Sequence, residues 1–164
     1  MSNANAETEA LARGPTDAAA AVICGGLIAG TIDIGSACVI NMLSPRIILQ
    51  AIASGLLGAA SFQGGLPAEL AGLGLQWGMS LLIAAIFVVG AMRIRWLRRH
   101  WIAAGAAYGV VIYAVMNYVV VPLSAAPFHP STHLDKIVEN LLAMLLFGLI
   151  VAGTTRVMVR DRGS

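Results

Sequence analysis

Four runs of about twenty mainly apolar residues restrict how this chain can fold. They cover residues 18–42, 70–92, 101–121 and 134–155. A helix needs roughly 20 such residues to cross a hydrocarbon core of about 30 Å. The composition agrees, because 59% of the residues are hydrophobic and only 11% are charged, whereas soluble domains are roughly a quarter charged. We therefore expect an all-α polytopic membrane protein whose transmembrane helical bundle spans residues 18–156.

A fifth apolar stretch, residues 46–62, is shorter and contains Gly55 and Gly58. Lys and Arg in short loops stay on the cytoplasmic side, so basic residues indicate where this stretch lies. The basic turn RIRWLRRHW (residues 93–101) and the arginines near the C-terminus mark two cytoplasmic positions, separated by two spans. Counting spans back from the basic turn places residues 43–68 at the outer face, where we expect 46–62 to form an interfacial or re-entrant helix. If 46–62 crosses instead, there are five spans and the N-terminus is outside.

The four-span interpretation places both termini in the cytoplasm of a bacterial inner membrane. Residues 1–17 are then a flexible tail and residues 157–164 a second tail. Trp96 and Trp101 flank the basic turn, and indole rings favour the headgroup layer. We interpret the turn as a topology determinant, with a patch for anionic lipid as the alternative. A net charge of +2 is too small for a nucleic-acid-binding surface, so the lipid bilayer is the expected partner.

Asp33 is the most informative residue, since an ionised carboxylate near the bilayer centre costs about 2.5 to 3.5 kcal/mol even on a lenient scale. On a helical wheel it shares a narrow stripe with Gly26 and Gly30. Glycines in GxxxG spacing favour close packing against another helix, so Asp33 is expected to face the bundle interior. It is either a buried packing determinant, which we favour, or an ion or proton site.

The third span repeats the GxxxG spacing at Gly105 and Gly109 and carries Asn117 in its outer half. Counting residues places Asn117 at a depth compatible with contact to Asp33, directly or through one water. The third span is therefore a candidate partner surface for the first. Asn117 is equally explained as an interhelical hydrogen-bonding group worth about 1 kcal/mol.

Glu139 enters the fourth span by about one turn. It either neutralises Lys136 at a helix start, where the helix dipole favours a negative charge, or forms a relay toward Asn117 and Asp33. The preceding loop has an HxxxH pattern followed by two acids, which are metal-ligand types: His129, His133, Asp135 and Glu139.

Two prolines interrupt the helix that would align these histidines, so we expect a solvated loop and no metal or cofactor. A pH response through the histidines is an alternative. The sequence contains no GxSxG, HExxH or P-loop motif. We therefore do not expect an enzyme.

Three glycine-rich strings carry a resemblance to a known group: GLIAGTIDIGSA, SPRIILQAIASGLLGAASFQGG and AAGAAYGVVIYAVMNYVVVPLSAAP. Together they resemble small bacterial inner-membrane proteins and are distantly similar to the YagU-type family, over roughly residues 26–156. The resemblance implies a polytopic helical bundle and supplies no established reaction. Members of the family tend to carry a His in the second span and another in the fourth, where this chain has Trp77 and Met144. The resemblance therefore implies no His-dependent role for this chain.

Two functions from different classes remain. The first is a non-enzymatic packing or accessory protein that associates with itself or another membrane protein through its GxxxG faces. The second is a small proton- or ion-linked transporter that uses Asp33, assisted by Asn117 and Glu139. The first predicts that Gly30→Leu or Gly109→Leu abolishes association while Asp33→Asn is tolerated. The second predicts the reverse sensitivity.

Overall fold

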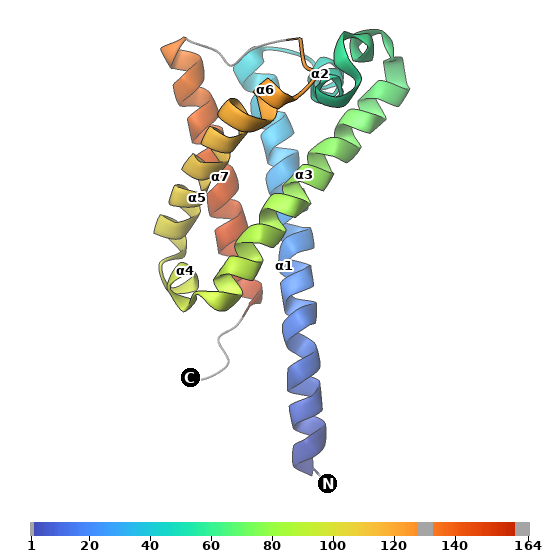
Figure 1. Cartoon of the computed structure of the whole chain (residues 1–164). Coiled ribbons are helices and arrows are strands. Elements are labelled where there is room, and N and C mark those ends of the chain that lie inside the picture. The colour runs from blue at the N-terminus through green and yellow to red at the C-terminus, as the bar shows by residue number, and fades with distance from the viewer. Residues whose placement is uncertain (1, 128–132, 160–164) are drawn as a thin grey trace.

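The computed structural model describes residues 2–127 and 133–159, and every regular element in these ranges is a helix (Figure 1). The predicted all-α class is therefore confirmed. The elements in chain order are α1 (Ser2–Asn41), α2 (Pro45–Leu57), the 3-10 helix η1 (Gly58–Gln63), α3 (Gly65–Arg93), α4 (Arg95–Arg99), α5 (Trp101–Val115), the π-helix η2 (Met116–Val120), α6 (Val121–Leu123) and α7 (Leu134–Met158).

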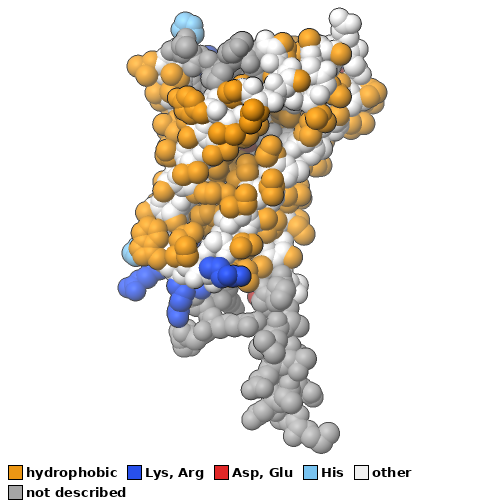
Figure 2. All heavy atoms as spheres, viewed as in Figure 1, with side chains coloured by type: hydrophobic (Ala, Val, Ile, Leu, Met, Phe, Trp, Pro, Cys, Tyr) orange, Lys and Arg blue, Asp and Glu red, His pale blue; other side chains and the backbone are white. Residues whose placement is uncertain are grey.

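Five helical segments of the described chain are long and apolar enough to cross a membrane, which indicates a multi-pass membrane protein. They are Thr16–Asn41, Pro45–Gln63, Gly65–Arg93, Trp101–Leu123 and Leu134–Met158. Figure 2 shows hydrophobic side chains over the face between the two ends of the bundle, with Lys and Arg gathered at one end. An apolar belt of this kind suits contact with lipid tails.

Two helices begin earlier than predicted. α1 begins at Ser2, so the structure has helix where a flexible tail was expected. The segment is rich in Ala and Glu, which are strong helix formers even without an apolar run. α3 begins at Gly65, five residues before the start predicted from apolar residues alone. Hydropathy locates the apolar part of a helix, whereas local propensity extends the helix beyond it.

The helices pack in the spatial order α5, α7, α1, α3, α2, so that α7 lies between α1 and α5 (Figure 1). The buried core is composed mostly of alanine: Ala29, Ala84, Phe87, Ala91, Ala104, Ile112, Phe147, Val151 and Ala152. Small side chains let helix backbones approach closely, which replaces the hydrophobic driving force that is missing in lipid. Tyr108 also links α5 to α3, which are not adjacent in this order. Its hydroxyl donates a hydrogen bond of 2.8 Å to Ile83 O of α3.

Both ends of α2 lie at the same end of the bundle. α2 begins at Pro45, soon after α1 ends at Asn41. Near its other end, Gly55 O accepts a hydrogen bond of 2.9 Å from Ala125 N, and Ala125 follows the last turn of α6. Figure 1 shows α2 beside the end of α1 and the start of α3. α2 therefore does not run from one end of the bundle to the other.

Candidate functional site

Asp33 lies where α1 crosses α3, and its carboxylate is paired with an amide. Gln76 of α3 donates a hydrogen bond from Nε2 to Asp33 Oδ2 at 2.7 Å. In the part of the chain that the structure describes, no cationic side chain forms an ion pair with Asp33. Asp33 thus faces another helix, as predicted, but the partner belongs to the second span and not to the third. Gln76 is an isolated amide within the second apolar run, and it was not predicted from the sequence as a partner for Asp33.

The glycines of the Asp33 stripe bring α1 and α3 into close contact. A Cβ atom added to Gly26 would lie 3.0 Å from Leu81 Cα, and one added to Gly30 would lie 2.9 Å from Ser80 Cβ. Such short distances leave no room for a side chain. Trp77 Nε1 also donates to Thr31 Oγ1 at 3.4 Å. Close backbone approach, and not only the polar pair, therefore holds the two helices together.

The second predicted pair of packing glycines lies between α5 and α7. A Cβ added to Gly105 would lie 2.9 Å from Gly148 O, and one added to Gly109 would lie 2.8 Å from Leu145 Cα. Gly148 of α7 completes the crossing from the other side and was not identified from the sequence. The GxxxG faces of α1 and α5 thus each pack against a helix of the same chain.

Asn117 lies apart from this crossing. Its Nδ2 donates to Tyr113 O of the preceding turn at 2.9 Å, within the segment where α5 passes into η2. α7 packs between α5 and α1, so the third span is not the surface on which Asp33 packs. Residue counting matched the depths of Asp33 and Asn117 but could not identify the helix between them.

Glu139 is paired at the start of α7, as one of its two predicted roles requires. Lys136 Nζ lies 3.1 Å from Glu139 Oε2, and the same ammonium donates to Ile40 O. Lys136 therefore ties the first turn of α7 to the last turn of α1. Glu139 is 45% exposed and forms an ion pair with Lys136, so the side chains do not form the expected relay to Asn117 and Asp33.

The outer loop lies partly outside the described residues, and His129 is among those that fall there. His133 immediately precedes α7 as its N-cap residue. Within residues 2–127 and 133–159, no three His, Cys, Asp or Glu side chains gather in a way that could hold a metal ion.

A third glycine pair is left open on the surface. Gly74 and Gly78 of α3 have GxxxG spacing, and a Cβ added to either would meet nothing within 4 Å. Both residues are exposed. Sequence analysis did not identify this pair, since the spacing is the same for covered and uncovered glycines.

No family model, curated protein or solved structure matches this chain, so the resemblance to the YagU-type family stays a prediction.

Proposed function

We propose that this chain is a non-enzymatic accessory membrane protein that associates through the exposed glycine face of α3, formed by Gly74 and Gly78. The observation that carries the proposal is that, in the described part of the chain, no atom lies within 4 Å of a Cβ added to either glycine, whereas neighbouring helices cover the GxxxG faces of α1 and α5. Glycines at this spacing allow the backbone of a second helix to approach closely in a membrane.

The proposed occupant is the same face of a second copy. Two-fold symmetric pairing is the commonest assembly of identical chains, and it brings one surface patch onto itself. An α3–α3 crossing at Gly74 and Gly78 meets this condition, since both glycines lie on one surface of one helix. Pairing with a different membrane protein is the alternative that the experiment below separates.

The proposed membrane arrangement has four spans, formed by α1, α3, α5 with η2 and α6, and α7, while α2 and η1 lie in the outer interface. The hydrogen bond between Gly55 O and Ala125 N supports it, because it holds the later part of α2 at the end where α6 finishes. The basic turn at the opposite end then faces the cytoplasm, together with both termini. A bacterial inner membrane is the proposed location.

The Asp33–Gln76 pair has a supporting role in this proposal. It lies on the side of α3 that packs against α1, whereas Gly74 and Gly78 lie on the exposed side of α3. Interhelical hydrogen bonds in membranes contribute roughly 0.6 to 2 kcal/mol each. The pair therefore helps set how α3 crosses α1 and, through this, how the glycine face is presented.

The test compares Gly74→Leu and Gly78→Leu with Gly35→Leu in α1. Gly35 is a matched control, because a Cβ at Gly35 also meets nothing within 4 Å. The assay is energy transfer between differently labelled copies in liposomes. We expect transfer in the wild type and in Gly35→Leu, and its loss in the other two variants. Equal transfer in all four proteins would exclude the glycine face, and no transfer in the wild type would exclude self-association.

A second candidate function, a proton- or ion-linked carrier, is favoured by one observation. Asp33 is a carboxylate within an apolar helix whose paired group is the neutral amide of Gln76. Intramembrane ionisable residues often mark ion or proton pathways. Proton flux in liposomes, read by an internal pH dye, tests this function. Flux above that of empty liposomes that is lost in Asp33→Asn would favour the carrier, whereas equal flux in the two proteins would exclude a role for Asp33.

A further inference from the structure

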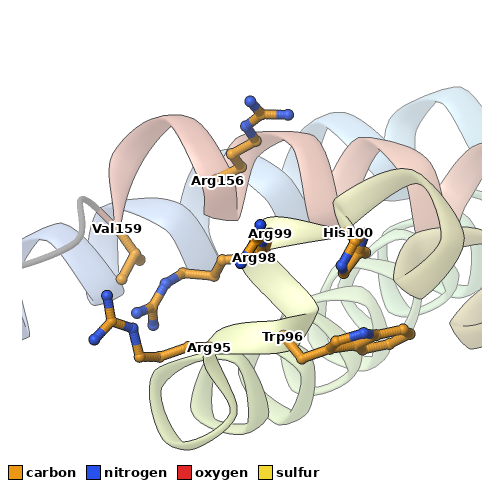
Figure 3. A pocket seen from close by; sticks show the side chains of 7 residues that line it. All are labelled: Arg95, Trp96, Arg98, Arg99, His100, Arg156 and Val159. Atoms are coloured by element: carbon orange, nitrogen blue, oxygen red, sulfur yellow. The ribbon is translucent and has the colours of Figure 1, made fainter.

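A strongly basic pocket lies at the end of the bundle where Lys and Arg gather (Figures 2 and 3). Its cavity volume is about 740 Å³, within the roughly 300–1,000 Å³ of small-molecule sites. Its lining includes Arg95, Trp96, Arg98, Arg99, His100 and Arg156. No carboxylate belongs to this lining in the part of the chain that is described.

The pocket depends on tertiary structure, because its walls come from α4 and from the last turns of α7. Ile94 is extended, at φ −116° and ψ 96°, which ends α3 and starts the short helix α4. α4 then turns its arginines toward the end of α7, where Arg156 lies. Figure 3 shows Arg95 and Arg98 extending in the same direction, near Val159, while Arg156 extends from α7 in a different direction. Residues about 60 positions apart thus form one pocket.

Two of the arginines are held in place by neighbours. Arg98 Nη1 donates to Ala91 O, the carbonyl of a residue in the last turns of α3. The guanidinium carbon of Arg156 lies 5.7 Å from the centre of the Trp101 ring, a distance suited to a cation–π contact. Guanidinium groups that are positioned in advance lose less conformational entropy when they bind an anion.

The concentration of positive charge favours an anion with several oxygen acceptors. Arginine presents a planar fork of donors that matches phosphate oxygens, and such charge-assisted pairs are about twice as strong as neutral hydrogen bonds. A phosphate group would also offset the repulsion among neighbouring guanidinium groups. Phosphate is therefore the chemical group that fits this pocket.

The surroundings of the pocket favour a lipid as the source of that phosphate. The rings of Trp96 and His100 lie 5.2 Å apart at its edge, and tryptophan favours the headgroup layer. Ile94 and Ile102 precede and follow the pocket residues in the sequence and are 52% and 59% exposed. An acyl chain can lie against such surface while its headgroup meets the arginines.

We propose that this pocket binds the phosphate of an anionic phospholipid headgroup, with Arg95, Arg99 and Arg156 as its ligands. This role is distinct from that of a topology determinant, which requires positive charge but no particular geometry. It is also independent of the glycine face on α3.

The test measures binding of phosphatidylglycerol and phosphatidylcholine to the delipidated full chain by native mass spectrometry. We expect the wild type to bind phosphatidylglycerol at least about tenfold more tightly than phosphatidylcholine, a ratio that corresponds to one charge-assisted interaction. Equal binding of the two lipids would overturn the proposal. This comparison requires no variant, so it does not depend on whether a mutant folds.

Replacement of arginine by lysine separates geometry from charge, because lysine keeps the charge and loses the planar fork. The double variant Arg95→Lys with Arg99→Lys is compared with Arg93→Lys, which lies in the same basic region but does not line the pocket. We expect phosphatidylglycerol binding to weaken about tenfold in the double variant and to stay unchanged in the control. Wild-type affinity in the double variant would reduce the cluster to a topology determinant.

A third arm adds inorganic phosphate and glycerol phosphate without lipid. We expect neither to displace phosphatidylglycerol at equal concentration, because the apolar surface beside the pocket contributes only to lipid binding. Displacement by either soluble anion at that concentration would assign the pocket to a soluble phosphate and overturn the lipid as its source.

Discussion

The crossing of α5 and α7 depends on a glycine of α7 that leaves no space for a methyl group. A Cβ added to Gly148 would lie 2.8 Å from Gly109 N and 3.0 Å from Gly109 Cα. These are backbone atoms, which cannot rotate away as a flexible side chain can. The added Cβ would also overlap Gly105 O, so the variant Gly148→Ala requires the two helices to separate along their contact.

The expected cost follows from two opposing effects. Overpacking of a tight contact costs about 1 to 3 kcal/mol, whereas replacing a mid-helix glycine by alanine gains up to about 1 kcal/mol in helix propensity. Gly153→Ala, in the same helix, has the same propensity gain without a clash, since its Cβ would lie 3.4 Å from the edge of the Trp101 ring. The difference between the two variants thus isolates the packing cost.

The assay is reversible unfolding in mixed micelles, followed by circular dichroism. We expect Gly148→Ala to have a free energy of unfolding about 1 to 3 kcal/mol lower than that of Gly153→Ala. Equal stabilities would show that α5 and α7 do not approach as closely as Gly105 and Gly109 indicate. A Gly148→Ala variant more stable than Gly153→Ala would refute the reasoning altogether, because the propensity gain is the same in both variants and the packing difference would then have the opposite sign.

Two further predictions concern the α1–α3 pair and the membrane arrangement. Gln76→Leu removes the donor to Asp33 and leaves a carboxyl without its interhelical partner, so it should lower the free energy of unfolding by about 1 to 3 kcal/mol. Asp33→Asn keeps an acceptor at this position and should lower the free energy of unfolding by less. A larger loss in Asp33→Asn than in Gln76→Leu would contradict the assigned hydrogen bond between the two residues. Ser44→Cys, between α1 and α2, with both native cysteines replaced by serine, should react with a membrane-impermeant thiol reagent from the outer side, while His100→Cys should not. Protection of Ser44→Cys in intact cells would favour a crossing α2, because a crossing α2 would begin at the cytoplasmic side.

The covered glycines change what mutations at GxxxG positions measure. Gly30→Leu and Gly109→Leu place side chains against Ser80 and Leu145 of the same chain. Their expected effect is therefore loss of the fold, and loss of a partner follows only as a consequence. Association is tested at Gly74 and Gly78 instead, where added side chains meet open space.

The sequence predicted that polar residues of the site face other helices, but it did not predict which residue each of them contacts. The sequence predicted that Asp33 faces a helix, which follows from helical periodicity. It gave the pairing with Lys136, three residues away, as one of two roles for Glu139. It did not predict Gln76 as the partner of Asp33, since the two are 43 positions apart. Helical periodicity determines which face a residue occupies but carries no information about which helix covers that face.

The sequence by itself determined the helical class, the apolar surface and the basic end of this protein. These properties depend on local composition, the length of apolar runs and the cost of moving charge into lipid, all of which act within one helix. Tertiary structure alone decided that α7 separates α1 from α5, that the basic pocket joins α4 to α7, and that Gly74 and Gly78 stay uncovered. Many helix pairs have compatible small-residue faces, so the choice among them depends on the packing of all helices together.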